Sequence, residues 1–352
     1  MKHTSLLTAA ILLFLGACKH APEIEAVCEN SVPCRYTIKW DITPELDGVV
    51  KIYASTRPES FNLREKPVAQ VPISDKICEV SLDGKPDIRY YFSLRFNNRY
   101  NHTVATRVPN LKSRANFRDI GGYKNAAGKS IRWGQVFRTG VICPLDEEGT
   151  KKFQSLQVNT WIDFRDSVRY IEPDSALCIK NIYHLPINLI TSSRIFEQLG
   201  NEKLRRGDAN VFMQNLFIDL AEKGIPTYRK MFELLADKKN YPVVLCDKYG
   251  KDYVGFAVAL LLSALEVPEE TIYSDFLFSN RLLDRCSIDI DRDGSTSDTQ
   301  EAATALMTTQ KLQLSCALHH IEAQYGSIQR YLQEELYLTP EKQARLQSIL
   351  LH

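Results

Sequence analysis

The segment from Tyr241 to Gly255 constrains the fold more than any other part of this chain. An apolar run, Pro242 to Leu245, predicts a buried strand, and Phe256 to Leu265 predicts a buried helix. The loop between them contains Gly250 and leads to Gly255. Such a unit directs backbone N–H groups and the positive end of a helix dipole toward one point. It therefore suits a bound phosphate, although strand–loop–helix units alone are common.

The loop residues resemble the signature of the tyrosine-phosphatase-like family that also acts on phosphoinositides, which reads His-Cys-x-x-Gly-Lys-Asp-Arg-Thr-Gly. Gly250-Lys251-Asp252 and Gly255 match it. Without a gap, the family's nucleophilic Cys falls on Asp247, its His on Cys246 and its Arg on Tyr253. A one-residue gap would keep Cys246 as nucleophile but would still end on Tyr253. We prefer the ungapped alignment, because a cradle of converging N–H groups tolerates insertion poorly.

Four further blocks resemble the family's motifs in the expected order, so that the resemblance covers roughly residues 111–350. It implies an α/β fold with a parallel-rich sheet flanked by helices, and the pattern predicts helices over Pro226–Ala236 and Val254–Leu265. The blocks are Asn116–Tyr123 followed by Gly128 and Arg132–Thr139, Trp161–Arg165 with Pro173-Asp174, Ser274–Asn280, and Tyr325–Leu332.

The family's chemistry needs a thiolate nucleophile, an Arg that clamps phosphate, backbone amides and an acid. At these positions the chain has Asp247, which repels a phosphate dianion, and Tyr253, which carries no charge. The resemblance implies that Asp252 is the general acid and that Lys251 assists phosphate binding. The alternative is that they form a salt-bridged pair at the start of the helix. We expect an ionised Asp247 that faces the loop amides and occludes the pocket.

Cys246 is either thiolate-like at a helix N-terminus or a buried cysteine at the end of a strand. Arg138 and Arg165 are candidate substrate-binding residues that would replace the missing clamp. The alternative for these arginines is a buried ion-pair network that also includes Arg118, Asp119 and Asp163.

Three functional hypotheses follow. The first is a catalytically impaired pseudophosphatase with a residual phosphate-binding pocket, which would bind a phosphorylated protein or lipid headgroup. The second is an active divergent protein-tyrosine or phosphoinositide phosphatase that uses Cys246 and Asp252. The third is a surface adhesion or assembly lipoprotein that acts through an N-terminal β-sandwich. The net charge of +1 gives no indication of nucleic-acid binding.

The N-terminus has the layout of a secretory signal. Lys2 and His3 precede the apolar run Leu6 to Leu15, which is too short to span a bilayer. Leu15-Gly16-Ala17-Cys18 matches a bacterial lipobox, which predicts a signal peptide over residues 1–17 and lipidation at Cys18; an ordinary signal peptide is the alternative. We therefore expect a cell-envelope lipoprotein held at the outer membrane or a periplasm-facing membrane by its N-terminal lipid.

Residues 18–30 are predicted to form a polar tether and 31–110 an accessory β-sandwich, resembling a fibronectin type III or immunoglobulin-like module. The region from 111 to 352 is the phosphatase-like domain. Within the predicted sandwich, turn residues separate short runs that favour β-strands, and several of these runs alternate with period two. The runs are Arg35–Trp40, Val49–Tyr53, Ala69–Ile73, Ile77–Leu82 and Arg89–Phe96.

Two other features carry weaker expectations. Asp289, Asp291, Asp293 and Ser295 have the spacing of an EF-hand-like calcium loop, but Gln300 replaces the usual Glu. A solvated acidic loop is the alternative, and no other cofactor is indicated. Lys203–Gly207 lies in a charged, helix-prone insert between Ile190 and Gly224, a region that often forms a lid in the family that the chain resembles. Cys28 and Cys34 could close a small loop, and no cysteines have zinc spacing.

Overall fold

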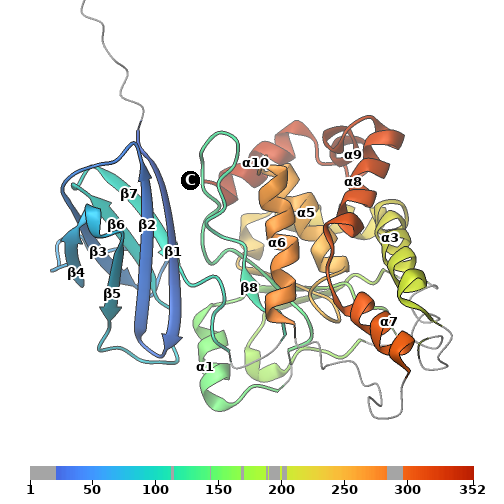
Figure 1. Ribbon diagram of the computed structural model, residues 1–352, viewed down its shortest axis with the longest axis horizontal. Coiled ribbons are helices and arrows are strands. Elements are labelled where there is room, and N and C mark those ends of the chain that lie inside the picture. Colours follow the sequence, from blue (N-terminus) through green and yellow to red (C-terminus); the bar gives the residue numbers. More distant parts are fainter. Residues whose placement is uncertain are drawn as a thin grey trace, which may run out of the picture.

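The computed structural model describes residues 21–111, 115–142, 144–167, 170–187, 189, 199, 204–283 and 296–352. A β-sandwich, blue to teal in Figure 1, lies beside a larger α/β domain. Within the described residues, no helix combines the length and apolar character needed to cross a membrane. Cys18, Lys203 and the predicted calcium residues Asp289, Asp291, Asp293 and Ser295 lie outside this part of the chain.

The β-sandwich consists of two antiparallel sheets with strand orders β1-β2-β5 and β4-β3-β6-β7. Their inner faces share one core that includes Ile38, Trp40 and Phe92. Because β4 pairs with β3 rather than with β5, the order is of the fibronectin type III kind and not that of an immunoglobulin constant domain. The strands are β1 Glu23–Val32, β2 Arg35–Thr43, β3 Val49–Ser55, β4 Ala69–Pro72, β5 Ile77–Ser81, β6 Tyr91–Phe96 and β7 Tyr100–Ala105.

The predicted tether over residues 18–30 is too long, because β1 begins at Glu23 and pairs with β2 along its length. Ile24 and Cys28 point into the core, and the glutamates between and beside them hide this alternation in the sequence. Cys28 and Cys34 do not close a loop, since both carry free thiols. The described cysteines with free thiols are Cys28, Cys34, Cys78, Cys178, Cys246 and Cys316.

The α/β domain has a five-stranded sheet of order β11-β10-β12-β9-β8, in which only β8 runs antiparallel to its neighbour. This confirms the predicted parallel-rich sheet. The residues of β9, β10 and β12 are all buried, as expected for strands covered on both faces. The strands are β8 Arg118–Asp119, β9 Val136–Thr139, β10 Thr160–Asp163, β11 Asn181–His184 and β12 Val243–Cys246.

Helices cover the sheet unequally. A small core around Phe153 of α1 covers one face, and a larger core built on α3, α5, α6 and α8 covers the other. Helix α5 is buried almost all round, which is why its sequence is apolar without helical periodicity. The helices are α1 Glu147–Ser155, α3 Arg206–Lys223, α4 Ile225–Leu235, α5 Tyr253–Ala264, α6 Glu269–Leu282, α7 Ser297–Met307, α8 Lys311–Tyr325, α9 Ile328–Glu334 and α10 Pro340–Leu350.

The two helices predicted from the sequence, Pro226–Ala236 and Val254–Leu265, are α4 and α5, each displaced by one residue. Of the predicted lid between Ile190 and Gly224, the structure describes residue 199 and the part from residue 204 onward, and Arg206–Lys223 of this part form α3. Helix α3 packs against α7 and α8, so this end of the segment belongs to the packed helical layer.

Candidate functional site

The Asp247 carboxylate occupies the centre of the loop that joins β12 to α5. Its Oδ1 atom accepts hydrogen bonds from the backbone N–H groups of Tyr249, at 2.8 Å, and Gly250. Its Oδ2 atom accepts one from Val254, at 2.9 Å, in the first turn of α5. The residue is 4% exposed. A side chain of the protein therefore takes the N–H groups that this kind of loop offers to an anion.

The pKa of Asp247 is raised, first by burial and then by the nearby Asp252 carboxylate. The N–H donors of Val254, Gly250 and Tyr249 act in the opposite direction but do not outweigh the burial. The contacts with the loop amides are those expected from the sequence, and burial adds an opposing effect on the pKa that the sequence does not show.

Cys246 is fully buried, and its side chain belongs to the core on the α1 face of the sheet. The thiol donates to the carbonyl oxygens of Gly140, at 3.5 Å, and Asp247, at 3.4 Å. Burial, followed by the charge of Asp163, raises the pKa of this thiol well above its usual value. The structure thus corrects the thiolate-like alternative: Cys246 is a protonated cysteine at the end of a buried strand.

Lys251 and Asp252 form the salt-bridged pair that the sequence offered as an alternative. The Lys251 Nζ atom lies 2.5 Å from Asp252 Oδ1, and the two side chains are 1% and 18% exposed. Tyr253 begins α5, and its carbonyl oxygen accepts a hydrogen bond from Tyr228 Oη at 3.1 Å. The loop therefore offers a neutral ring where the family pattern has Arg.

Arg138 does not serve as a replacement clamp. Its guanidinium donates to Asp275 Oδ2 at 2.6 Å and to the Gly250 carbonyl at 2.7 Å, and its side chain has no exposed surface. Arg118 lies equally deep and donates to Asp275 Oδ1 at 3.2 Å. These contacts correct the substrate-binding assignment of Arg138. Its guanidinium instead links the Gly250 carbonyl of the loop to Asp275 of α6.

Asp275 was not singled out from the sequence, although it lies in the matched block Ser274–Asn280. Burial on its own raises the pKa of this carboxyl, but Arg118 and Arg138 outweigh that effect and lower it below the usual range. Asn116 completes the arrangement by donating to the Gly250 carbonyl at 2.8 Å. The available signal was the presence of an acidic residue, Asp275, inside the matched block Ser274–Asn280.

Arg165 is the second corrected residue. Its guanidinium pairs with Asp163, with Nη2 to Oδ2 at 2.6 Å, and also donates to the Ile171 carbonyl at 2.7 Å. The Arg165 carbonyl contacts His184 Nε2 at 2.8 Å, and the His184 ring stacks on Tyr170 with centroids 4.0 Å apart. Sequence reasoning missed this aromatic pair, in which His184 is the last residue of β11.

Gly250 fixes the shape of the loop. Its φ is +66°, and a Cβ atom added there would lie 2.4 Å from Gly140 N and 2.5 Å from the Thr139 carbonyl carbon. A glycine is therefore required both by the backbone conformation and by the approach of the loop to the end of β9. The match of Gly250 to the family pattern has this physical cause.

The sequence profile of the tyrosine phosphatase family matches residues 109–352. The chain belongs to the tyrosine phosphatase family. A relative from Cupriavidus necator bears the name "Putative tyrosine-protein phosphatase" and is 25% identical over 228 residues. That match covers 63% of this chain and 81% of the relative.

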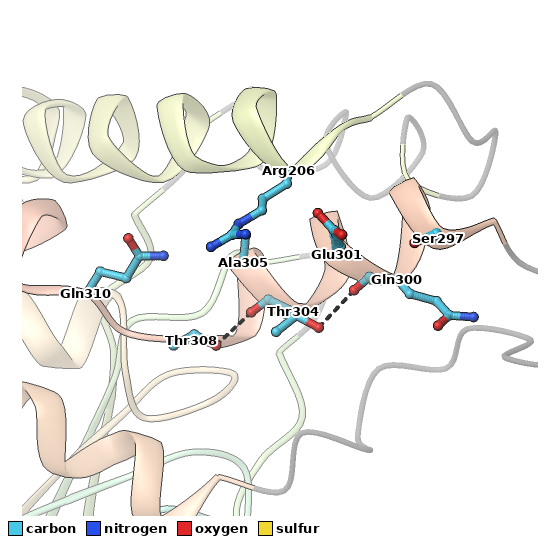
Figure 2. Close-up of a pocket in the computed structure, with 8 residues that line it drawn as sticks. All are labelled: Arg206, Ser297, Gln300, Glu301, Thr304, Ala305, Thr308 and Gln310. Atoms are coloured by element: carbon cyan, nitrogen blue, oxygen red, sulfur yellow. Dashed lines mark hydrogen bonds between the residues drawn. The ribbon is translucent and has the colours of Figure 1, made fainter.

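A separate hollow of about 530 Å³ lies between the start of α3 and α7, and none of its lining residues belongs to the loop (Figure 2). Thr304 and Thr308 donate their hydroxyl hydrogens to carbonyl groups four residues earlier in α7, both at 2.8 Å. The lining residues are Arg206, Ser297, Gln300, Glu301, Thr304, Ala305, Thr308 and Gln310.

Proposed function

We propose that this protein is a pseudophosphatase: a tyrosine phosphatase family member whose catalytic loop no longer hydrolyses phosphate esters. The observation that carries the proposal is the set of three backbone hydrogen bonds to the Asp247 carboxylate. A phosphate ester in this loop would have to displace a buried carboxylate and would be repelled by it. The native loop is therefore closed by an internal anion rather than available to a phosphorylated protein or a lipid headgroup.

The remaining side chains support the same conclusion. In-line attack on phosphorus requires an accessible nucleophile, and Cys246 is buried, protonated and directed toward the α1 core. Charge stabilisation requires an Arg whose fork is free to bind oxygens, and Arg138 and Arg165 are engaged with Asp275 and Asp163. Within the part of the chain that the structure describes, the loop thus has neither an accessible nucleophile nor a free arginine clamp.

The second part of the proposal is a membrane anchor. The run Leu6–Leu15 followed by Leu-Gly-Ala-Cys18 supports export and lipidation at Cys18, which would hold the mature chain at a membrane of the cell envelope. Incorporation of labelled palmitate tests this. We expect label in the full chain and none in Cys18→Ser; equal labelling of both would contradict the anchor.

Hydrolysis of p-nitrophenyl phosphate by residues 21–352 tests the pseudophosphatase assignment. We expect no turnover above buffer, and the same result for Cys246→Ser and Asp252→Asn. Turnover by the wild type that disappears in Cys246→Ser would contradict the proposal and support the active phosphatase with Cys246 as nucleophile.

Restoring activity should require three changes together: Cys246→His, Asp247→Cys and Tyr253→Arg. Nucleophile and clamp act as a unit, so each single change is expected to give little. The variant with Tyr253→Arg alone is the matched control, because it adds the positive charge without the nucleophile.

A further inference from the structure

Arg89, in the segment before β6 of the sandwich, inserts its side chain into the α/β domain. Its Nη1 atom lies 2.7 Å from Asp119 Oδ2, and the two side chains are 3% and 0% exposed. The same guanidinium donates to the Thr106 carbonyl at 2.8 Å and lies 4.7 Å from the Tyr91 ring centroid. A charged side chain buried this deeply is stable only with such partners.

Two backbone N–H groups hold the Asp119 carboxylate in the position where it meets the Arg89 guanidinium. Its Oδ1 atom accepts from the Gly121 N–H group and its Oδ2 atom from the Gly134 N–H group, both at 2.7 Å. Both glycines belong to the blocks that match the family's opening motif. The carboxylate therefore links two turns of the α/β domain by hydrogen bonds, and it also forms the ion pair with Arg89.

Further contacts surround this ion pair. Trp133 lies in the blocks that match the family motifs, yet its ring is buried in the sandwich core and its Nε1 atom donates to the Thr103 carbonyl at 3.0 Å. Arg107, at the end of the sandwich, donates to the carbonyls of Asp119 and Gly121, both at 2.9 Å. The two domains thus share a core side chain as well as a buried charge pair.

The ion pair also lies next to Arg118, one of the residues that hold the loop between β12 and α5 in place. Strand β8 consists of two residues, Arg118 and Asp119, whose side chains point in opposite directions. Asp119 binds Arg89 of the sandwich, whereas Arg118 binds Asp275, which in turn binds Arg138 beneath Gly250. Strand β8 therefore contacts the sandwich through Asp119 and the residues that hold the loop through Arg118.

We propose that the β-sandwich is an obligate, rigidly docked part of the phosphatase-like domain, locked by Arg89 in a socket made by Asp119, Gly121 and Gly134. The sandwich is then neither a flexible spacer nor an independent module. The lock itself holds whether or not the loop is catalytic.

Calorimetric melting of residues 21–352 tests the lock. We expect one cooperative transition for the wild type. Arg89→Met leaves a buried carboxylate without its cation, so it should lower the Tm by about 5–10 °C. Arg89→Met with Asp119→Asn should cost less than the sum of the two single changes.

Arg132→Met is the matched control, since Arg132 pairs with Glu59 across the same junction but is partly exposed. It should change the Tm by less than about 2 °C. Two separate transitions in the wild type, or equal effects of Arg89→Met and Arg132→Met, would overturn the proposal.

A second experiment separates the lock from a simple loss of stability. Residues 109–352 expressed alone should lack a sharp melting transition, whereas co-expression with residues 21–108 as a separate chain should restore one and should co-purify both chains. Arg89→Met in the shorter chain should abolish this co-purification. A soluble 109–352 fragment that melts as sharply as the whole chain would overturn the proposal.

Discussion

The Oδ2 atom of Asp247 accepts the backbone hydrogen of Val254 at 2.9 Å, so the N-terminal turn of α5 is bound by a carboxylate from its own loop. Helix N-termini attract anions because their first N–H groups have no partner within the helix. In this chain the anion is covalently part of the protein. The loop therefore keeps the shape expected of a phosphate-binding loop without needing phosphate to organise it.

The close approach of Gly250 to β9 gives a first prediction. Gly250→Ala places a Cβ 2.4 Å from Gly140 N at a φ of +66°, so we expect a loss of at least about 3 kcal/mol in the free energy of unfolding. Gly128→Ala is the control, because its φ of +76° is comparable but no atom lies within 4 Å of the added Cβ. It should cost about 1–2 kcal/mol in urea unfolding. Equal costs would show that the contact with β9 is unimportant.

The buried thiol gives a second prediction. Burial raises the pKa of Cys246, so iodoacetamide at pH 7 should alkylate it at least about 100-fold more slowly than the exposed Cys178. Mass spectrometry of the alkylated peptides measures both rates in one sample. After denaturation the two cysteines should react alike. Rapid alkylation of native Cys246 would be the behaviour of a nucleophile and would contradict the assignment.

A third prediction concerns pH. Burial, then Lys124 and His352, lowers the pKa of His102 to about 4 in the folded protein, from about 6.5 when unfolded. The folded state therefore binds fewer protons than the unfolded state between these values. His102 contributes stability that is complete above pH 6.5 and is lost as the pH falls toward 4.

His102→Gln removes this titration. The free energy of unfolding of the wild type, relative to that of the variant, should fall by about 1–3 kcal/mol between pH 7 and pH 4. Denaturant unfolding at several pH values measures the difference. A difference between wild type and His102→Gln that is independent of pH would contradict the assignment.

The sheet and the helices α4 and α5 could be predicted because their sequences carry local signals. The apolar run at Pro242–Leu245 and the long apolar stretch of α5 have no reasonable alternative to burial. Strand β1 was missed for the opposite reason. Three glutamates lie among its inward residues, and pairing with β2, rather than composition, makes it a strand.

The site was only partly predictable. Alignment alone placed Asp247 at the nucleophile position, because the loop is short and its glycines fix the register. The partners of Arg138 could not be found in the same way, since Asp275 lies 137 residues further along the chain and meets it only through the packing of α6. Burial decides the direction of the Asp247 pKa, and burial is a property of the whole fold.

Calorimetric titration with inorganic phosphate tests the central claim most directly. Asp247→Ala should free the N–H groups of Tyr249, Gly250 and Val254, at a cost in stability of about 1–3 kcal/mol, and should bind phosphate with a Kd of about 1 mM or below. Asp252→Ala is the matched control, because it removes an adjacent negative charge but leaves the amides occupied.

The account predicts binding by Asp247→Ala and none by the wild type or by Asp252→Ala. Wild-type protein that binds phosphate as tightly as Asp247→Ala would mean that the carboxylate does not fill the loop, and the account would be wrong.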